Sequence, residues 1–168
     1  DTEAFTALTA RLTAARGDAA RRTPGTQPAE HFYEEALRLD PKCLAAMEGM
    51  ALLQERRGDH HTAWQWYRRA LDSGSVRPSV LNSYAWIAAS QPQLALFDKR
   101  AVWTAQRAVA AMPIAEFWDT LAEVRERQGD LVGALEAAQE SLRDHPDRVE
   151  YQQRFQRLSQ FVKRTGRA

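Results

Sequence analysis

The chain has 168 residues and a net charge of +1, and hydrophobic and charged residues make up 44% and 27% of it. These values are ordinary for one globular domain, and so small a net charge gives no global field that would attract nucleic acid or an acidic partner. The single cysteine, Cys43, excludes an internal disulfide. No apolar run reaches the roughly 18–20 residues that span a bilayer. We therefore expect a soluble protein of the cytoplasm or the periplasm.

The predicted elements are helices throughout, because Ala, Arg, Gln, Glu and Leu dominate while Val and Ile are scarce. Apolar spacing predicts a first helix at about 4–16, marked by Phe5, Leu8, Leu12 and Ala15. A loop rich in Gly, Pro and Thr is predicted at 17–28. The remaining helices are predicted in chain order at about 28–39, 43–57, 60–73, 78–90, 98–112, 115–128, 131–144 and 147–164.

Pairs of small residues seven apart recur inside these helices. Residues seven apart lie on the same helix face, where small side chains let a neighbouring helix approach closely. The period is near 34 residues, with a short insertion in the third repeat around 90–100. This pattern predicts stacked helical hairpins. The pairs are Ala29 and Ala36, Ala63 and Ala70, Ala101 and Ala108, and Ala134 and Ser141.

Two near-identical phrases, "LQERRGD" at 53–59 and "VRERQGD" at 124–130, fall at the same phase of this period. Gly tolerates the left-handed conformation at a helix end, and Asp caps the helix that follows. Gly58-Asp59 and Gly129-Asp130 are therefore predicted to mark the turn inside a hairpin.

The register of small and large residues resembles the tetratricopeptide repeat family. The resemblance implies an all-α fold of about four hairpins over 28–146, with a degenerate half-repeat and flexible loop at 1–27 and a capping helix with a basic tail at 147–168. The residues that carry it are Met47, Met50, Ala51, Ala63, Tyr67 and Ala70 in one repeat, Leu81, Tyr84, Ala85, Ala101, Ala108 and Pro113 in the next, and Trp118, Leu121, Ala122, Ala134, Ala138, Ser141 and Pro146 in the last.

By the same resemblance, the inner face of the repeats would bind a peptide or helix of a partner, as in a scaffold or adaptor. Three carboxylates on one helix beside an aromatic and an amide suggest an acidic groove for a basic or amphipathic segment, while the alternative is an ordinary solvated helix face. The resemblance also suggests bacterial versions of the family. The candidate partner-binding residues are Glu48, Leu52, Asn82, Trp86, Glu116, Asp119 and Glu123.

Two other surfaces suggest other functions. Trp66 and Trp103 fall on the outer helices, and an exposed aromatic patch would suit self-association, or a regulatory or oligomerisation domain of a larger enzyme or secretion complex. The basic stretch at 154–168 suits phosphate, an anionic membrane or an acidic partner, or the acidic groove of a second copy. Cations that complement the end of a capping helix are the simpler interpretation.

No catalytic motif is present. His60 and His61 are adjacent and point about 100° apart on a helix, so they do not jointly hold one metal. Cys43 has no base in register, and the chain has no Gly-rich phosphate loop. We expect no enzyme, no cofactor, no metal and no small-molecule substrate, and a protein or peptide as the partner.

Overall fold

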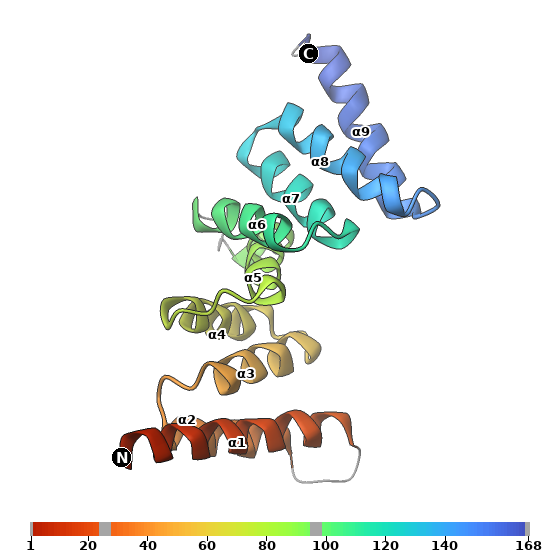
Figure 1. Cartoon of the computed structure of the whole chain (residues 1–168). Helices are drawn as coiled ribbons and strands as arrows, with labels where there is room; N and C mark the ends of the chain where they lie inside the picture. Colours follow the sequence, from red (N-terminus) through yellow and green to blue (C-terminus); the bar gives the residue numbers. More distant parts are fainter. Residues whose placement is uncertain (1, 24–27, 95–98, 167–168) are drawn as a thin grey trace. The chain divides into compact units, whose positions relative to one another are not determined.

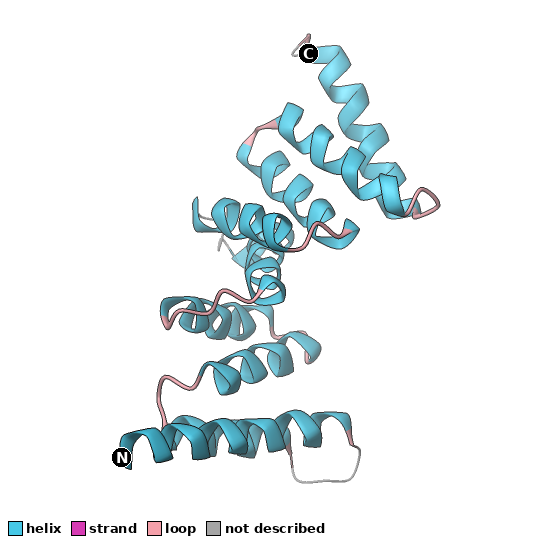
Figure 2. Cartoon of the chain, in the orientation of Figure 1, coloured by secondary structure: helices cyan, strands magenta, loops and turns pink. Residues whose placement is uncertain are grey.

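The computed structural model describes residues 2–23, 28–94 and 99–166. Within these ranges the chain forms helices and turns without a strand (Figure 2). It divides into two compact units, Asp1–Val76 and Arg77–Ala168. Part of the expected loop (24–27), part of the insertion (95–98) and the end of the basic tail (167–168) lie outside the described residues.

The first unit consists of two hairpins (Figure 1). The long first helix packs against the second, and the third packs against the fourth and also against both helices of the first hairpin. The helices are α1 (Thr2–Arg22), α2 (Ala29–Leu39), α3 (Leu44–Arg56) and α4 (His60–Asp72).

The second unit repeats this arrangement and adds one helix. α5 pairs with α6 and α7 with α8, α7 also packs against both helices of the preceding hairpin, and α9 packs against α8 (Figure 1). The helices are α5 (Pro78–Ser90), the 3-10 turn η1 (Pro92–Leu94), α6 (Lys99–Ala111), α7 (Ala115–Gln128), α8 (Leu131–Asp144) and α9 (Val149–Thr165).

The small residues that define the repeat are buried, which confirms their predicted place between packed helices. Bulkier side chains at these positions would hold the helix axes apart. Ala29 is 8% exposed, and Ala36, Ala63, Ala70, Ala101, Ala108, Ala134 and Ser141 are 0% exposed.

The repeated Gly-Asp phrase forms the same turn twice, as predicted. Gly58 and Gly129 adopt φ of 80° and 86°, the left-handed conformation that ends α3 and α7. The Asp59 and Asp130 carboxylates each accept a backbone N–H three residues on, at 3.0 Å, and so cap α4 and α8. Because each phrase closes one helix and opens the next, it fixes the hairpin geometry.

The first helix is longer than predicted, and the expectation of a loop over 17–28 is wrong for residues 17–22. Gly17 is buried against the ring of Tyr33 on α2, and the Tyr33 hydroxyl donates a hydrogen bond to Asp18 at 2.7 Å. Tertiary contact thus outweighs the local cost of Gly in a helix, which is about 1 kcal/mol.

Tyr33 is 0% exposed, and burial together with the Asp18 hydrogen bond raises its pKa to about 12. The folded state therefore keeps the phenolic proton above the unfolded pKa of about 10. This contribution to stability, about 2–3 kcal/mol, is fully present below pH ~10 and is lost as the pH rises through ~12. Urea unfolding across this range should show an extra loss in the wild type that Tyr33→Phe lacks; equal losses in both would contradict this account.

Candidate functional site

The first helices of the hairpins in the second unit carry most of the predicted partner-binding residues. On α7, Asp119 and Glu123 are half-buried, with side chains 23% exposed. Both contact Arg154 of α9: Nε donates to Asp119 Oδ1 at 2.8 Å, and Nη2 donates to Glu123 Oε2 at 3.2 Å. Because Arg154 is itself only 18% exposed, this ion-pair network is largely shielded from solvent.

Glu126, one turn further along α7, extends the network. It lies 3.6 Å from Arg154 and accepts two hydrogen bonds from Arg157, at 2.6 and 2.9 Å. Two guanidinium groups of α9 therefore face three carboxylates of α7. We call Asp119, Glu123, Glu126, Arg154 and Arg157 the α7–α9 network.

Burial raises the pKa of Asp119 and of Glu123 above their usual values, even though Arg154 acts to lower both. Neighbouring carboxylates add to the rise: Glu150 for Asp119, and Asp119 and Glu126 for Glu123. Desolvation thus raises these two pKa values more than the ion pairs with Arg154 lower them. Arg154 therefore reduces the free-energy cost of keeping both carboxylates ionised.

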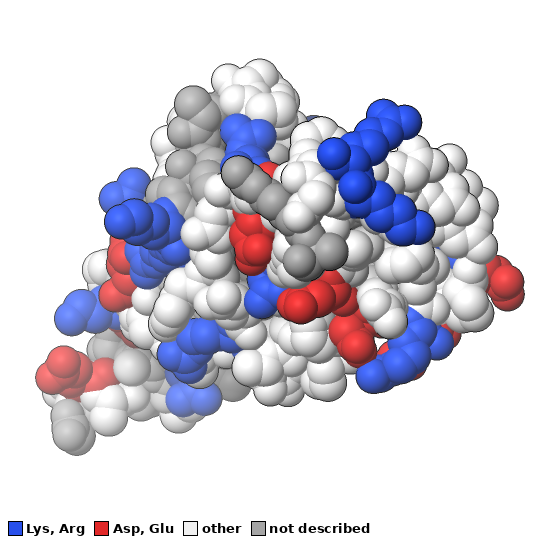
Figure 3. Space-filling view, turned by 90° about the horizontal axis from the view of Figure 1, so that it is seen from above, with Lys and Arg blue, Asp and Glu red and all other residues white. Residues whose placement is uncertain are grey.

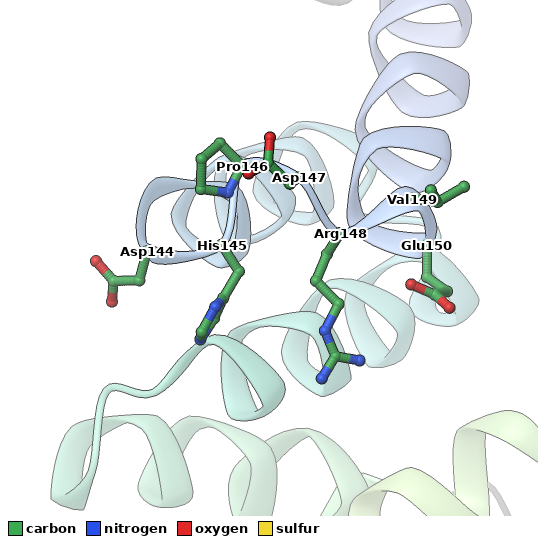
Figure 4. Close-up of a pocket in the computed structure, with 7 residues that line it drawn as sticks. All are labelled: Asp144, His145, Pro146, Asp147, Arg148, Val149 and Glu150. Carbon is green, nitrogen blue, oxygen red and sulfur yellow. The ribbon is translucent and has the colours of Figure 1, made fainter.

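Glu116, at the start of α7, is more open. Its side chain is 51% exposed, and its Oε1 lies 4.0 Å from Arg148 Nη2 in the α8–α9 turn. This turn surrounds a depression of about 470 Å³, where the His145 and Arg148 side chains point to the same side (Figure 4). A contact this long and exposed contributes little to stability.

The sequence predicted Asp119 and Glu123 as candidate site residues, but neither Glu126 nor the two arginines that pair with these carboxylates. Arg154 and Arg157 belong to the stretch interpreted above as a basic tail, and their three-residue spacing on one helix face was the available signal. Arg154 and Arg157, considered above as part of a contact between two copies, pair with carboxylates of α7 within one chain. Acidic and basic side chains are also interspersed on the face shown in Figure 3.

On α5, Asn82 and Trp86 are both half-buried. The Asn82 Oδ1 atom is buried and accepts no hydrogen bond in the described part of the chain. Near the end of α5, a shallow depression of about 370 Å³ reaches the α7–α9 network. It is lined by Ala89, Ser90, Pro92, Glu123, Glu126, Arg127, Arg154 and Arg157.

In the first unit, Glu48 and Leu52 on α3 are half-buried. The Glu48 carboxylate accepts a hydrogen bond from Ser75 at 2.6 Å, which ties α3 to the segment after α4. Glu48 thus has a structural contact that its repeat position did not reveal.

The outer tryptophans differ from each other. Trp66 is half-buried against the core of the first unit, with Arg69 over its ring at 5.1 Å. Trp103 is 47% exposed, with Arg107 over its ring at 4.8 Å. Among the described residues, only Trp103 of this pair therefore presents a large aromatic surface to solvent.

Within the described ranges, no three His, Cys, Asp or Glu side chains gather in a way that would hold a metal ion. In the same part of the chain, no helix is both long and apolar enough to cross a membrane.

These stacked hairpins define a helical repeat protein. Small residues lie where the helices contact one another, and a Gly-Asp turn joins the two helices in two of the hairpins. The chain has the tetratricopeptide repeat fold, as comparison with solved structures shows. No protein-family model matches the sequence, and a comparison with curated proteins found no match.

Three solved structures illustrate the likeness. YrrB, described as a TPR protein with an unusual peptide-binding site, aligns with 94% of this chain and 76% of its own at 18% identity and a TM-score of 0.72. MamA from residue 41 to its end, from Desulfovibrio magneticus RS-1, aligns with 92% of this chain over 85% of its own length, at 17% identity and a TM-score of 0.74. The Sgt2 TPR domain from Aspergillus fumigatus aligns with 74% of this chain over 82% of its own length, at 17% identity and a TM-score of 0.60. At these identities the likeness shows the fold.

Proposed function

We propose that this protein is an interaction scaffold that binds an extended peptide or a helix of a partner on the α5–α7 face of its second unit. The face consists of Asn82, Trp86, Glu116, Asp119 and Glu123. The proposal is supported by the repeat fold and by one observation above all: half-buried Asn82, Trp86, Asp119 and Glu123 lie on first helices, where a stacked array presents side chains at regular spacing. Glu48 and Leu52 are the equivalent candidates on α3.

The chemistry of this face favours a partner segment with both basic and apolar residues. Trp86 supplies apolar area, and the Asn82 amide oxygen, turned outward by rotation of its side chain, would accept a backbone N–H. Three carboxylates of the α7–α9 network face two guanidinium groups, so this end of the face is rich in acceptors for a partner cation. A partner cation would add to this network rather than enter an empty acidic groove.

A selection from a random peptide library on the immobilised full chain tests this proposal. We expect the recovered peptides to carry Lys or Arg beside apolar residues and to lose at least about tenfold in affinity, or 1.4 kcal/mol, with Trp86→Ala or Glu116→Lys. Asp119 and Glu123 are not replaced in this experiment, because a change at either would remove an ion-pair partner of the partly buried Arg154. Trp103→Ala is the matched control, since it removes an indole elsewhere on the same unit.

Equal binding by all these variants would contradict the α5–α7 face. Loss confined to Trp103→Ala would instead favour the second candidate, a contact surface for oligomerisation or regulation centred on the outer helix α6. The exposed indole of Trp103 is the observation that supports this alternative. The half-buried Trp66 supports it less, because its ring already packs within the chain.

A further inference from the structure

The first helix has two apolar faces, and the described residues cover only one of them. Ala10, Ala14 and Gly17 are buried within the first unit. On the other face, Phe5, Leu8 and Leu12 are 71%, 52% and 61% exposed, and Ala15 and Ala19 are exposed as well. The sequence marked this helix by Phe5, Leu8, Leu12 and Ala15, which are exposed, and not by its buried residues. We call Phe5, Leu8, Leu12, Ala15 and Ala19 the α1 stripe.

The spacing of the α1 stripe is that of a helix–helix seam. Its residues are separated by three, four, three and four positions, the alternation with which two helices pack along their length. A helix of this size extends about 30 Å. Three large apolar side chains more than half exposed on one line are unusual for a surface helix, whose outer face is normally polar.

The distribution of large and small residues along the α1 stripe indicates which partner would cover it. All the large residues lie in the first half, and the second half carries only alanines. We propose that the α1 stripe is a self-association surface, on which α1 of a second copy lies antiparallel. In this arrangement Leu8 faces Ala19 and Leu12 faces Ala15 of the other copy, so each leucine meets an alanine. Phe5 faces the exposed Arg22 of the other copy.

The charges beside the stripe favour the same arrangement. In the antiparallel register that places Leu12 against Ala15, Arg11 of each copy lies beside Asp18 of the other. Arg11 is exposed and the Asp18 side chain is 40% exposed, so both reach the edge of such an interface. A parallel pair would bring Arg11 towards Arg16 of the other copy and small residues against small ones, which leaves the seam half empty.

Sedimentation of the full chain across a range of concentrations up to about 1 mM tests this. A single pair of helices buries less than the roughly 1,200–2,000 Å² of a standard interface, so we expect a dimer that dissociates on dilution. Leu8→Gln with Leu12→Gln should abolish the dimer without unfolding the chain, because both side chains are exposed. Phe161→Gln, which removes a 52% exposed aromatic from α9, is the matched control and should dimerise like the wild type.

The orientation has its own test with a short bismaleimide crosslinker. An introduced cysteine at Ala15 lies within one turn of its counterpart in the antiparallel pair, whereas one at Glu3 lies about 30 Å from its counterpart. Ala15→Cys should crosslink and Glu3→Cys should not. Native Cys43 is 2% exposed, and the wild-type chain serves as the control for any crosslinking through this residue. A monomer at every concentration, a dimer retained by the double variant, or equal crosslinking at both positions would overturn the proposal.

Discussion

Replacing Gly49 with alanine is expected to lower the free energy of unfolding by about 1–3 kcal/mol. Alanine in place of glycine inside a helix normally has the opposite effect, a gain of roughly 0.5–1 kcal/mol. The sign reverses because Tyr33 lies between Gly17 of α1 and Gly49 of α3. A Cβ at Gly49 would lie 2.9 Å from Tyr33 Cδ1 and closer still to Cε1 and Cζ, all atoms of a ring that is 0% exposed.

A double-mutant cycle checks this explanation by urea unfolding followed by far-UV circular dichroism. Tyr33→Leu removes the ring and is destabilising by itself, because it leaves a cavity in the core of the first unit. In that background Gly49→Ala should be neutral or stabilising, so the two changes are strongly coupled. A stabilising Gly49→Ala in the wild-type background would show that α3 and Tyr33 are not in close contact.

Replacing Arg154 with methionine is expected to cost about 2–3 kcal/mol at neutral pH, somewhat less than the loss of a partner from a fully buried ion pair. Methionine keeps the apolar stem but leaves Asp119 and Glu123 half-buried without their cation. Arg157→Met is the matched control, because Arg157 lies on the same helix but is 60% exposed. It should cost no more than about 1 kcal/mol.

The cost of Arg154→Met should also depend on pH. Because the pKa values of Asp119 and Glu123 are raised in the folded chain, the folded state binds more protons than the unfolded state. The two carboxyl groups therefore lower the free energy of unfolding as the pH rises through their pKa values. Without Arg154 both pKa values rise further. The difference between variant and wild type should therefore be smaller near pH ~4 than near pH ~7. A difference that is constant with pH would contradict the α7–α9 network.

The fold was predictable because its determinants are local and periodic. The buried pairs, such as Ala63 with Ala70, repeat at a fixed spacing, and each Gly-Asp turn depends on two residue types that have few other uses at a helix end. The helix bounds of the repeats accordingly agree with the prediction to within a few residues. The predicted end of α1 was wrong, because contact with Tyr33 of α2 keeps residues 17–22 helical, and the local sequence of α1 does not show this contact.

The candidate site was predictable in part. The repeat register identified the first-helix positions, including Asp119 and Glu123, but it could not show that Arg154 reaches both of them. That contact depends on how α9 packs against the last hairpin, which a single helix pattern does not specify. The α1 stripe shows the same limit, since periodicity identifies an apolar face without saying whether the chain itself covers it.

The proposal that the α5–α7 face binds a partner is tested most directly by amide hydrogen exchange, measured with and without the tightest peptide from the library selection. The account predicts slower exchange in α5 and α7, with α1 and α6 unchanged. Protection confined to α6 or to α1, with α5 and α7 unaffected, would contradict it and place binding on Trp103 or on the α1 stripe.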